Sequence, residues 1–186
     1  MALRSTIYKA VLQIADMDRA YYAEHSLVIA RHPSETDERM MTRLLAFALN
    51  AQDGLTFGRG LCIDDEPDLW CKDLTGAVQA WIEVGLPDEK WLRKACGRSK
   101  EVMLYAYGRT ADSWWRNNGD RLARFDNLRV FRLEPAATVA LAALAARSSS
   151  SVAEPMPWTA MWPRTSASGS RLRHSSLPSR SSARTM

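Results

Sequence analysis

The spacing of hydrophobic residues divides the first part of the chain into predicted strands and helices. Residues 5–15 and 25–32 are β-branched segments of alternating polarity around a polar turn, a pattern that predicts an antiparallel hairpin. From Ser34, which can cap a helix, apolar residues follow at helical spacing to about Asn50. The chain is therefore predicted to open with a hairpin and one helix.

Glycine and proline residues separate the elements that follow. They divide residues 55–62, 69–72 and 77–84 into three predicted strands. After these we predict a helix over 87–96 that stops at Gly97, a strand over 102–107, a helix over 109–118 and a strand over 128–133. An alanine-rich helix over 135–147 is expected to pack poorly. The predicted class is mixed α/β, with a helix, three strands, a helix and a strand as its core and the hairpin added at the N-terminus.

Charge and composition limit the function classes. The 186 residues carry a formal net charge of +4, but residues 148–186 hold five arginines and one acid, so residues 1–147 balance at 20 basic and 20 acidic groups. The same segment holds 12 serines and four prolines. We predict a folded domain over 1–147 and a Ser/Arg/Pro-rich tail over 148–186 that is disordered, a basic arm, or translated in a shifted reading frame. The sequence shows no membrane span and no secretory signal, so we expect a cytoplasmic protein without a membrane partner.

Two carboxylates flank the second and third predicted strands. Asp68 follows Pro67 at the start of one strand, and Glu83 lies near the end of the next. A strand, turn and strand of this length can bring both groups to one end of a sheet, where carboxylate oxygens are ligands that Mg²⁺ accepts. A period of two places Glu83 on the same face as Trp81, either at the solvated rim of a half-buried strand or in a cleft.

The first helix supplies a third candidate acid. Glu38 lies three residues before Met41, on the flank of the apolar stripe, where it either points into a cleft beside the sheet or faces solvent. Glu35 is a poorer candidate, because pairing with Arg39 at i,i+4 and the helix N-terminus explain it.

Three segments carry a resemblance to a known family. The segments are ARHPSETDERMMTRLLAFAL, FGRGLCIDDEPDLW and WIEVGLPDEKWLRKAC. They resemble the YaeQ family of bacterial proteins, and the similarity extends from Met1 to roughly Ala146. The fold of this family resembles the PD-(D/E)XK, restriction-endonuclease-like nucleases. The resemblance implies Mg²⁺ held by Glu38, Asp68 and Glu83.

The sequence departs from the nuclease pattern at one position. Such nucleases carry a lysine two residues after the second acid, where this chain has Gly85. Some relatives supply the cation from the following helix, and Lys94, one turn after Lys90, is the best candidate here. The helix must then fold back over the sheet for Lys94 to reach Glu83. The predicted catalytic set is therefore Glu38, Asp68, Glu83 and Lys94.

Cations on the same predicted helix form a candidate nucleic-acid surface. The predicted contacts are Lys90, Arg93, Lys94 and Arg98, of which 90, 94 and 98 recur every four residues. The alternative is a solvated helix face whose last cations complement the helix dipole. We expect a Mg²⁺-dependent phosphodiesterase or nuclease acting on nucleic acid. The alternatives are a non-catalytic nucleic-acid or protein-binding module on the same fold, linked at family level to transcription antitermination, and an adaptor whose acids are surface charges.

Overall fold

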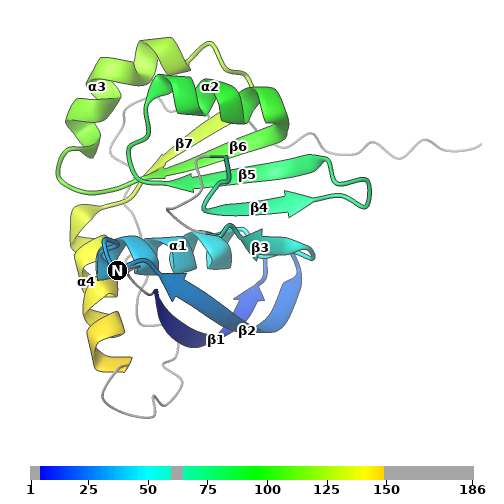
Figure 1. Ribbon diagram of the computed structural model, residues 1–186, viewed down its shortest axis with the longest axis vertical. Helices are drawn as coiled ribbons and strands as arrows, with labels where there is room; N and C mark the ends of the chain where they lie inside the picture. The colour runs from blue at the N-terminus through cyan, green and yellow to red at the C-terminus, as the bar shows by residue number, and fades with distance from the viewer. Residues whose placement is uncertain (1–4, 60–64, 149–186) are drawn as a thin grey trace, which may run out of the picture. The chain divides into compact units, whose positions relative to one another are not determined.

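The computed structural model describes residues 5–59 and 65–148 (Figure 1). The elements in chain order are β1 (Thr6–Asp16), β2 (Tyr21–Arg31), α1 (Asp37–Leu49), β3 (Leu55–Phe57), β4 (Leu69–Lys72), β5 (Val78–Val84), α2 (Glu89–Arg98), β6 (Ser99–Ala106), α3 (Ala111–Leu122), β7 (Leu128–Arg132) and α4 (Pro135–Ser148). The predicted order of helix, three strands, helix and strand is confirmed as α1, β3 to β5, α2 and β6. The predicted tail lies outside the described residues from position 149 onward.

The N-terminal hairpin is present as predicted. β1 and β2 pair antiparallel along their whole length, from Thr6 opposite Arg31 to Asp16 opposite Tyr21. The second strand begins at Tyr21, four residues earlier than expected. Alternate side chains point inward, and Leu12 and Leu27 pack on the central core. The alternation thus fixes which face of the hairpin contacts the rest of the fold.

The second sheet contains five strands in the order β3-β4-β5-β6-β7. β3, β4 and β5 are antiparallel neighbours, whereas β5, β6 and β7 are parallel and are joined by the crossover helices α2 and α3. The mixed sheet expected from the sequence is therefore confirmed. β3 ends at Phe57, short of the prediction, and the last predicted residues, 60–62, lie outside the described residues.

Helices cover both faces of this sheet. Figure 1 shows α2 and α3 on one face and α1 on the other, with the hairpin beyond α1. Trp81 of β5 packs with Ala95 of α2, whereas Ile82 belongs to the cluster that contains Phe47 of α1. Because both faces are covered, β5 is buried from Ala80 to Val84.

Three local predictions are wrong. α2 continues through Gly97, where a stop was predicted, and ends at Arg98. Beyond the local helix backbone, no atom of the described residues lies within 4 Å of the position that a Cβ of residue 97 would take. α1 is capped by Thr36, whose hydroxyl accepts from the Arg39 amide, and not by Ser34. α4 packs against α1 with Thr138 fully buried, so its small residues permit close contact. None of the helices in the described ranges is long and apolar enough to span a membrane.

Candidate functional site

Asp68 and Glu83 lie beside each other at the end of β5. Leu69 is opposite Ile82 in the β4–β5 register, and one further step places Asp68 opposite Glu83. Both carboxylates are buried, each with 7% of the residue exposed. Of the two positions expected for Glu83, the solvated rim is therefore wrong, because α2 and α1 cover both faces of its strand.

Arginine and backbone donors surround the carboxylate of Asp68. Arg39 Nη1 lies 3.1 Å from Oδ1, and Arg39 Nη2 lies 3.1 Å from Oδ2, which is a bidentate ion pair. The Val84 amide donates to Oδ2 at 2.8 Å. Arg43 Nε lies 4.0 Å from Oδ1. Both oxygens of Asp68 thus accept from groups that belong to the protein.

These donors fix the charge of Asp68. Burial raises the pKa of the Asp68 carboxyl, while the guanidinium groups of Arg39 and Arg43 and the Val84 amide oppose that rise. The nearby carboxylate of Glu35 adds to the rise. Both oxygens of Asp68 nevertheless accept from donors, so the group is the ion-pair partner of Arg39.

Glu83 has a different environment. Its Oε1 accepts from two indole groups, Trp81 Nε1 at 2.8 Å and Trp91 Nε1 at 2.7 Å. Burial, followed by the neighbouring charge of Asp68, raises the pKa of Glu83 to about 8, although the indole donors and Arg39 act in the opposite direction. Both indole N–H groups thus donate to one oxygen of a buried carboxyl group whose pKa lies above its ordinary value.

Glu38 lies at the contact between α1 and α4. The hydroxyl of Thr138 donates to Glu38 Oε1 at 2.6 Å, so the residue is half-buried and not on a solvated helix flank. Burial raises the pKa of Tyr107; Arg39 opposes the rise, and the carboxylates of Glu38 and Asp68 add to it. The Tyr107 hydroxyl thus lies within electrostatic reach of both acids.

The predicted pairing of Glu35 is wrong. Glu35 is buried and pairs with Arg43, with Oε2 2.8 Å from Nη2, and not with Arg39. It precedes the first turn of α1, so the i,i+4 spacing that would bring it to Arg39 does not apply. Arg43 also donates to the carbonyl of Ala30 at 3.1 Å, which connects α1 to the hairpin.

The backbone explains the missing motif lysine. Gly85 has φ of +120°, a conformation that residues with a Cβ adopt only with strain. The side-chain space itself is open, since a Cβ would meet only Tyr107, at 4.0 Å. A lysine at this position would therefore require a different backbone after Glu83.

α2 does fold over the sheet, as the Lys94 hypothesis requires. The indole of Trp91, on α2, contacts Glu83. Lys94 pairs with Asp65, and its Nζ lies 4.9 Å from the Trp91 ring centroid. A catalytic role of Lys94 stays a prediction.

The described residues do not fit a Mg²⁺ ion in this arrangement. Mg²⁺ requires several oxygen ligands in near-octahedral geometry. Asp68 is occupied by Arg39 and Val84, Glu83 accepts from two indoles, and Glu38 accepts from Thr138. Across residues 5–59 and 65–148 no group of three or more His, Cys, Asp or Glu side chains is placed to hold a metal. No reaction step through a metal follows from these contacts.

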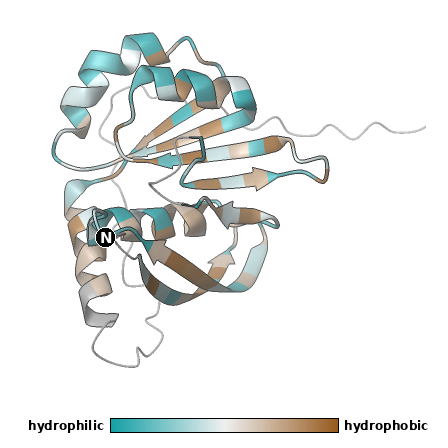
Figure 2. Cartoon of the chain, in the orientation of Figure 1, coloured by the Kyte–Doolittle hydropathy of each residue, from teal (hydrophilic) through white to brown (hydrophobic). Residues whose placement is uncertain are grey.

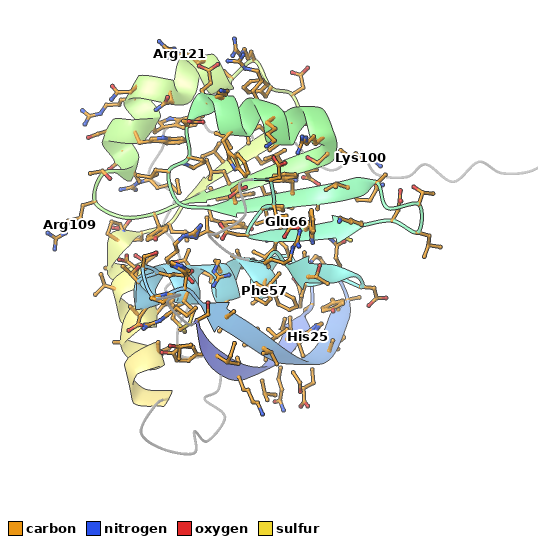
Figure 3. The ribbon with its side chains drawn as sticks, in the orientation of Figure 1. His25, Phe57, Glu66, Lys100, Arg109 and Arg121 are labelled. Carbon is orange, nitrogen blue, oxygen red and sulfur yellow. The ribbon has the colours of Figure 1, made fainter. Side chains whose placement is uncertain are left out.

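A second charged group lies on the helices that cover the other face. Three guanidinium groups from α2, α3 and the residues after α3 surround Glu89, and we call Arg93, Arg121 and Arg124 the arginine cluster. Arg93 Nη2 is 3.0 Å and Arg121 Nη1 3.8 Å from the carboxylate. The three side chains are 53–69% exposed, so the group carries two positive charges in excess on an accessible surface. Figure 3 shows Arg121 at the top of the molecule.

The four predicted nucleic-acid contacts separate into different surroundings. Arg93 belongs to the arginine cluster, whereas Lys94 and Arg98 both pair with Asp65, with Arg98 Nη1 at 3.6 Å. Lys90 is exposed. Figure 2 shows that the outer surfaces of α2 and α3 are largely hydrophilic. Of the four predicted contacts, Arg93 alone belongs to the arginine cluster; the every-fourth-residue stripe of residues 90, 94 and 98 does not, and the contribution of α3 was not predicted.

Sequence reasoning missed the residues that decide the chemistry of the carboxylates. Met40, Arg43 and Phe47 lie on one buried stripe of α1, and an arginine in such a stripe signals a buried acidic partner. The same argument extends to Arg39, one turn before Arg43. No local pattern identifies Thr138, which is one hundred residues from Glu38.

Comparison with known proteins gives consistent matches. Residues 1–154 match the family model described as YaeQ protein. The chain is 46% identical over 149 residues to "Uncharacterized protein YaeQ" of Escherichia coli (strain K12), which covers 80% of this chain and 82% of that protein. It is similar to the crystal structure of YaeQ protein from Xanthomonas axonopodis pv. citri, with a TM-score of 0.73, 56% identity, and 75% and 80% of the two chains covered. The corresponding values for YaeQ protein from Pseudomonas syringae are 0.72, 40%, 74% and 76%.

Proposed function

The chain belongs to the YaeQ family, as its resemblance predicted, and we propose that it binds nucleic acid through the arginine cluster of α2 and α3 without hydrolysing it. This is the binding-module alternative considered from the sequence. The observation that supports it is the excess of guanidinium groups around Glu89. One carboxylate neutralises at most one of three arginines, so a polyanion can neutralise the others.

Phosphodiester groups suit this surface. Guanidinium groups bind phosphate oxygens in a bidentate manner, and exposed ones do so without desolvating a buried charge. α3 also carries Trp115 with 40% of the residue exposed, a flat apolar surface of the kind on which an unpaired base stacks. An acidic surface on a partner protein could pair with the arginines but has no nucleic-acid base to stack on Trp115. A single-stranded nucleic acid is therefore the preferred ligand, and a link to transcription antitermination stays a prediction.

The state of the carboxylates supports binding over hydrolysis. Hydrolysis through Mg²⁺ would need Asp68 and Glu83 as metal ligands, whereas Asp68 is paired with Arg39 and Glu83 accepts two indole N–H groups. Both residues are buried, Asp68 against Arg39 of α1 and Glu83 against Trp91 of α2. These contacts stabilise the end of the sheet on which α2 lies, and thereby position the arginine cluster.

Fluorescence anisotropy with labelled single-stranded RNA and duplex DNA tests the proposal. Charge reversal at Arg121 and Arg124 together should weaken binding strongly, and the slope of log Kd against log salt should fall by about two, or about one per lost phosphate contact. Arg109→Glu combined with Lys9→Glu is the control of equal net charge, because both residues are exposed, Arg109 lies on the loop before α3, away from Arg121 (Figure 3), and Lys9 lies on β1. Equal losses in the cluster variant and the control would contradict a localised site.

A cleavage assay on the same nucleic acids separates the two functions. We expect intact RNA and DNA in the presence of Mg²⁺ or Mn²⁺ at concentrations where binding is saturated. Metal-dependent cleavage that disappears in Glu83→Gln, while binding persists, would overturn the proposal and establish the nuclease. Absence of salt-dependent binding by the full chain would also overturn it.

A further inference from the structure

A buried arginine occupies the place where a nuclease-like site would hold a cation. Arg39 projects from α1 to Asp68 across the end of β4 and β5, and only 19% of its side chain is exposed. Its two terminal nitrogens contact both carboxylate oxygens. The arginine therefore contacts the ligand atoms that a metal ion would need.

Two of the buried carboxyl groups are already paired with guanidinium groups. Glu35 faces Arg43, and Asp68 faces Arg39. Glu83, beside Asp68, accepts from the indole N–H groups of Trp81 and Trp91. A Mg²⁺ ion added to this set would leave an excess of buried positive charge, which is costly in a protein interior.

We propose that Arg39 is the resident cation of this site, and that its guanidinium group keeps divalent metal ions away from Asp68 and Glu83. Removal of the guanidinium group then leaves two adjacent buried carboxyl groups whose remaining described guanidinium neighbour is Arg43, with Nε 4.0 Å from Asp68 Oδ1 and paired with Glu35. Such a pair can bind a divalent cation, because the cation supplies positive charge and takes carboxylate oxygens as ligands. We therefore expect the site without Arg39 to bind a small divalent cation.

Manganese is the probe, because bound and free Mn²⁺ differ in their electron paramagnetic resonance signals. Four full-length proteins are compared: wild type, Asp68→Asn, Arg39→Met, which keeps most of the side-chain packing, and the double variant that combines Arg39→Met with Asp68→Asn. We expect no saturable Mn²⁺ binding in wild type, one site per chain in Arg39→Met, and loss of that site in the double variant. Saturable binding in wild type that Asp68→Asn removes would overturn the proposal.

Thermal unfolding with and without Mn²⁺ keeps the test decisive for a variant of low stability. A cation that binds only the folded state raises the Tm, so Mn²⁺ should raise the Tm of Arg39→Met and leave wild type and the double variant unchanged. If Arg39→Met is unfolded on its own, Mn²⁺ should restore its fold. A variant that neither binds Mn²⁺ nor responds to it in unfolding would show that Arg39 is not what excludes the ion. Neither readout depends on nucleic-acid binding.

Discussion

Replacement of Glu83 by glutamine should remove most of the pH dependence of stability that this site creates. Glutamine has nearly the shape of the protonated acid, and its amide oxygen can accept the same two indole N–H groups from Trp81 and Trp91. It cannot ionise. The difference in unfolding free energy between wild type and Glu83→Gln therefore isolates the titration of one group.

The direction of the effect follows from the two pKa values. Glu83 has a pKa of about 8 in the folded protein, against an ordinary value of 4.5. The folded state binds the proton more tightly, so this contribution to stability is fully present below about pH 4.5 and is lost as the pH rises through about 8. One pKa unit corresponds to roughly 1.4 kcal/mol, so wild type should lose about 4 kcal/mol relative to Glu83→Gln between about pH 5 and pH 8.

Urea unfolding across this pH range measures the difference. Thermal unfolding of the same two proteins should show this free-energy difference as a relative shift in Tm of roughly 10 °C. Glu83→Gln should be the more stable protein at alkaline pH. The ¹³C chemical shift of the Glu83 carboxyl group gives the pKa independently. A free-energy difference that does not change with pH, or a carboxyl titration near pH 4, would refute a neutral Glu83.

Three further substitutions test the surrounding contacts by chemical unfolding. Gly85→Ala should lower the free energy of unfolding by about 1–3 kcal/mol, because φ is positive at this position. Its control, Gly97→Ala inside α2, should raise the free energy of unfolding by up to about 1 kcal/mol. Equal effects of the two substitutions would argue against backbone strain at Gly85. Arg43→Met should lower the free energy of unfolding by about 3–5 kcal/mol, because it leaves the buried carboxylate of Glu35 unpaired. A loss below about 1 kcal/mol would mean that water solvates the Arg43–Glu35 pair. Thr138→Val should cost about 1–3 kcal/mol through its hydrogen bond to a carboxylate, against nearly none for Val139→Ala on the exposed face of α4.

Hydrophobic periodicity predicted the fold well because the elements are short and separated by clear turn residues. The hairpin, α1 and the order of the elements along the chain follow from alternation and helical spacing. The boundaries differ where tertiary packing overrides a local signal. Gly97 is a helix-stop residue by propensity, yet α2 continues through it because Ala95 and Leu92 on the buried face hold the helix on the sheet.

The candidate site was predictable in part. Asp68 and Glu83 meet because strand register brings them together, and register follows from sequence when the turn between two strands is short. What each acid does was not predictable, because their partners come from distant elements. Arg39 reaches Asp68 across 29 residues, and Thr138 reaches Glu38 across one hundred. Spacing along one element contains no information about such contacts.

The most direct measurement is a crystal structure of the full chain grown in Mn²⁺, with anomalous scattering recorded at the manganese edge. We expect no anomalous peak within coordination distance of Asp68 or Glu83, and Arg39 bidentate to Asp68. An anomalous peak between these two carboxylates, with the Arg39 side chain moved away, would contradict the conclusion that arginine takes the place of a metal ion in this protein.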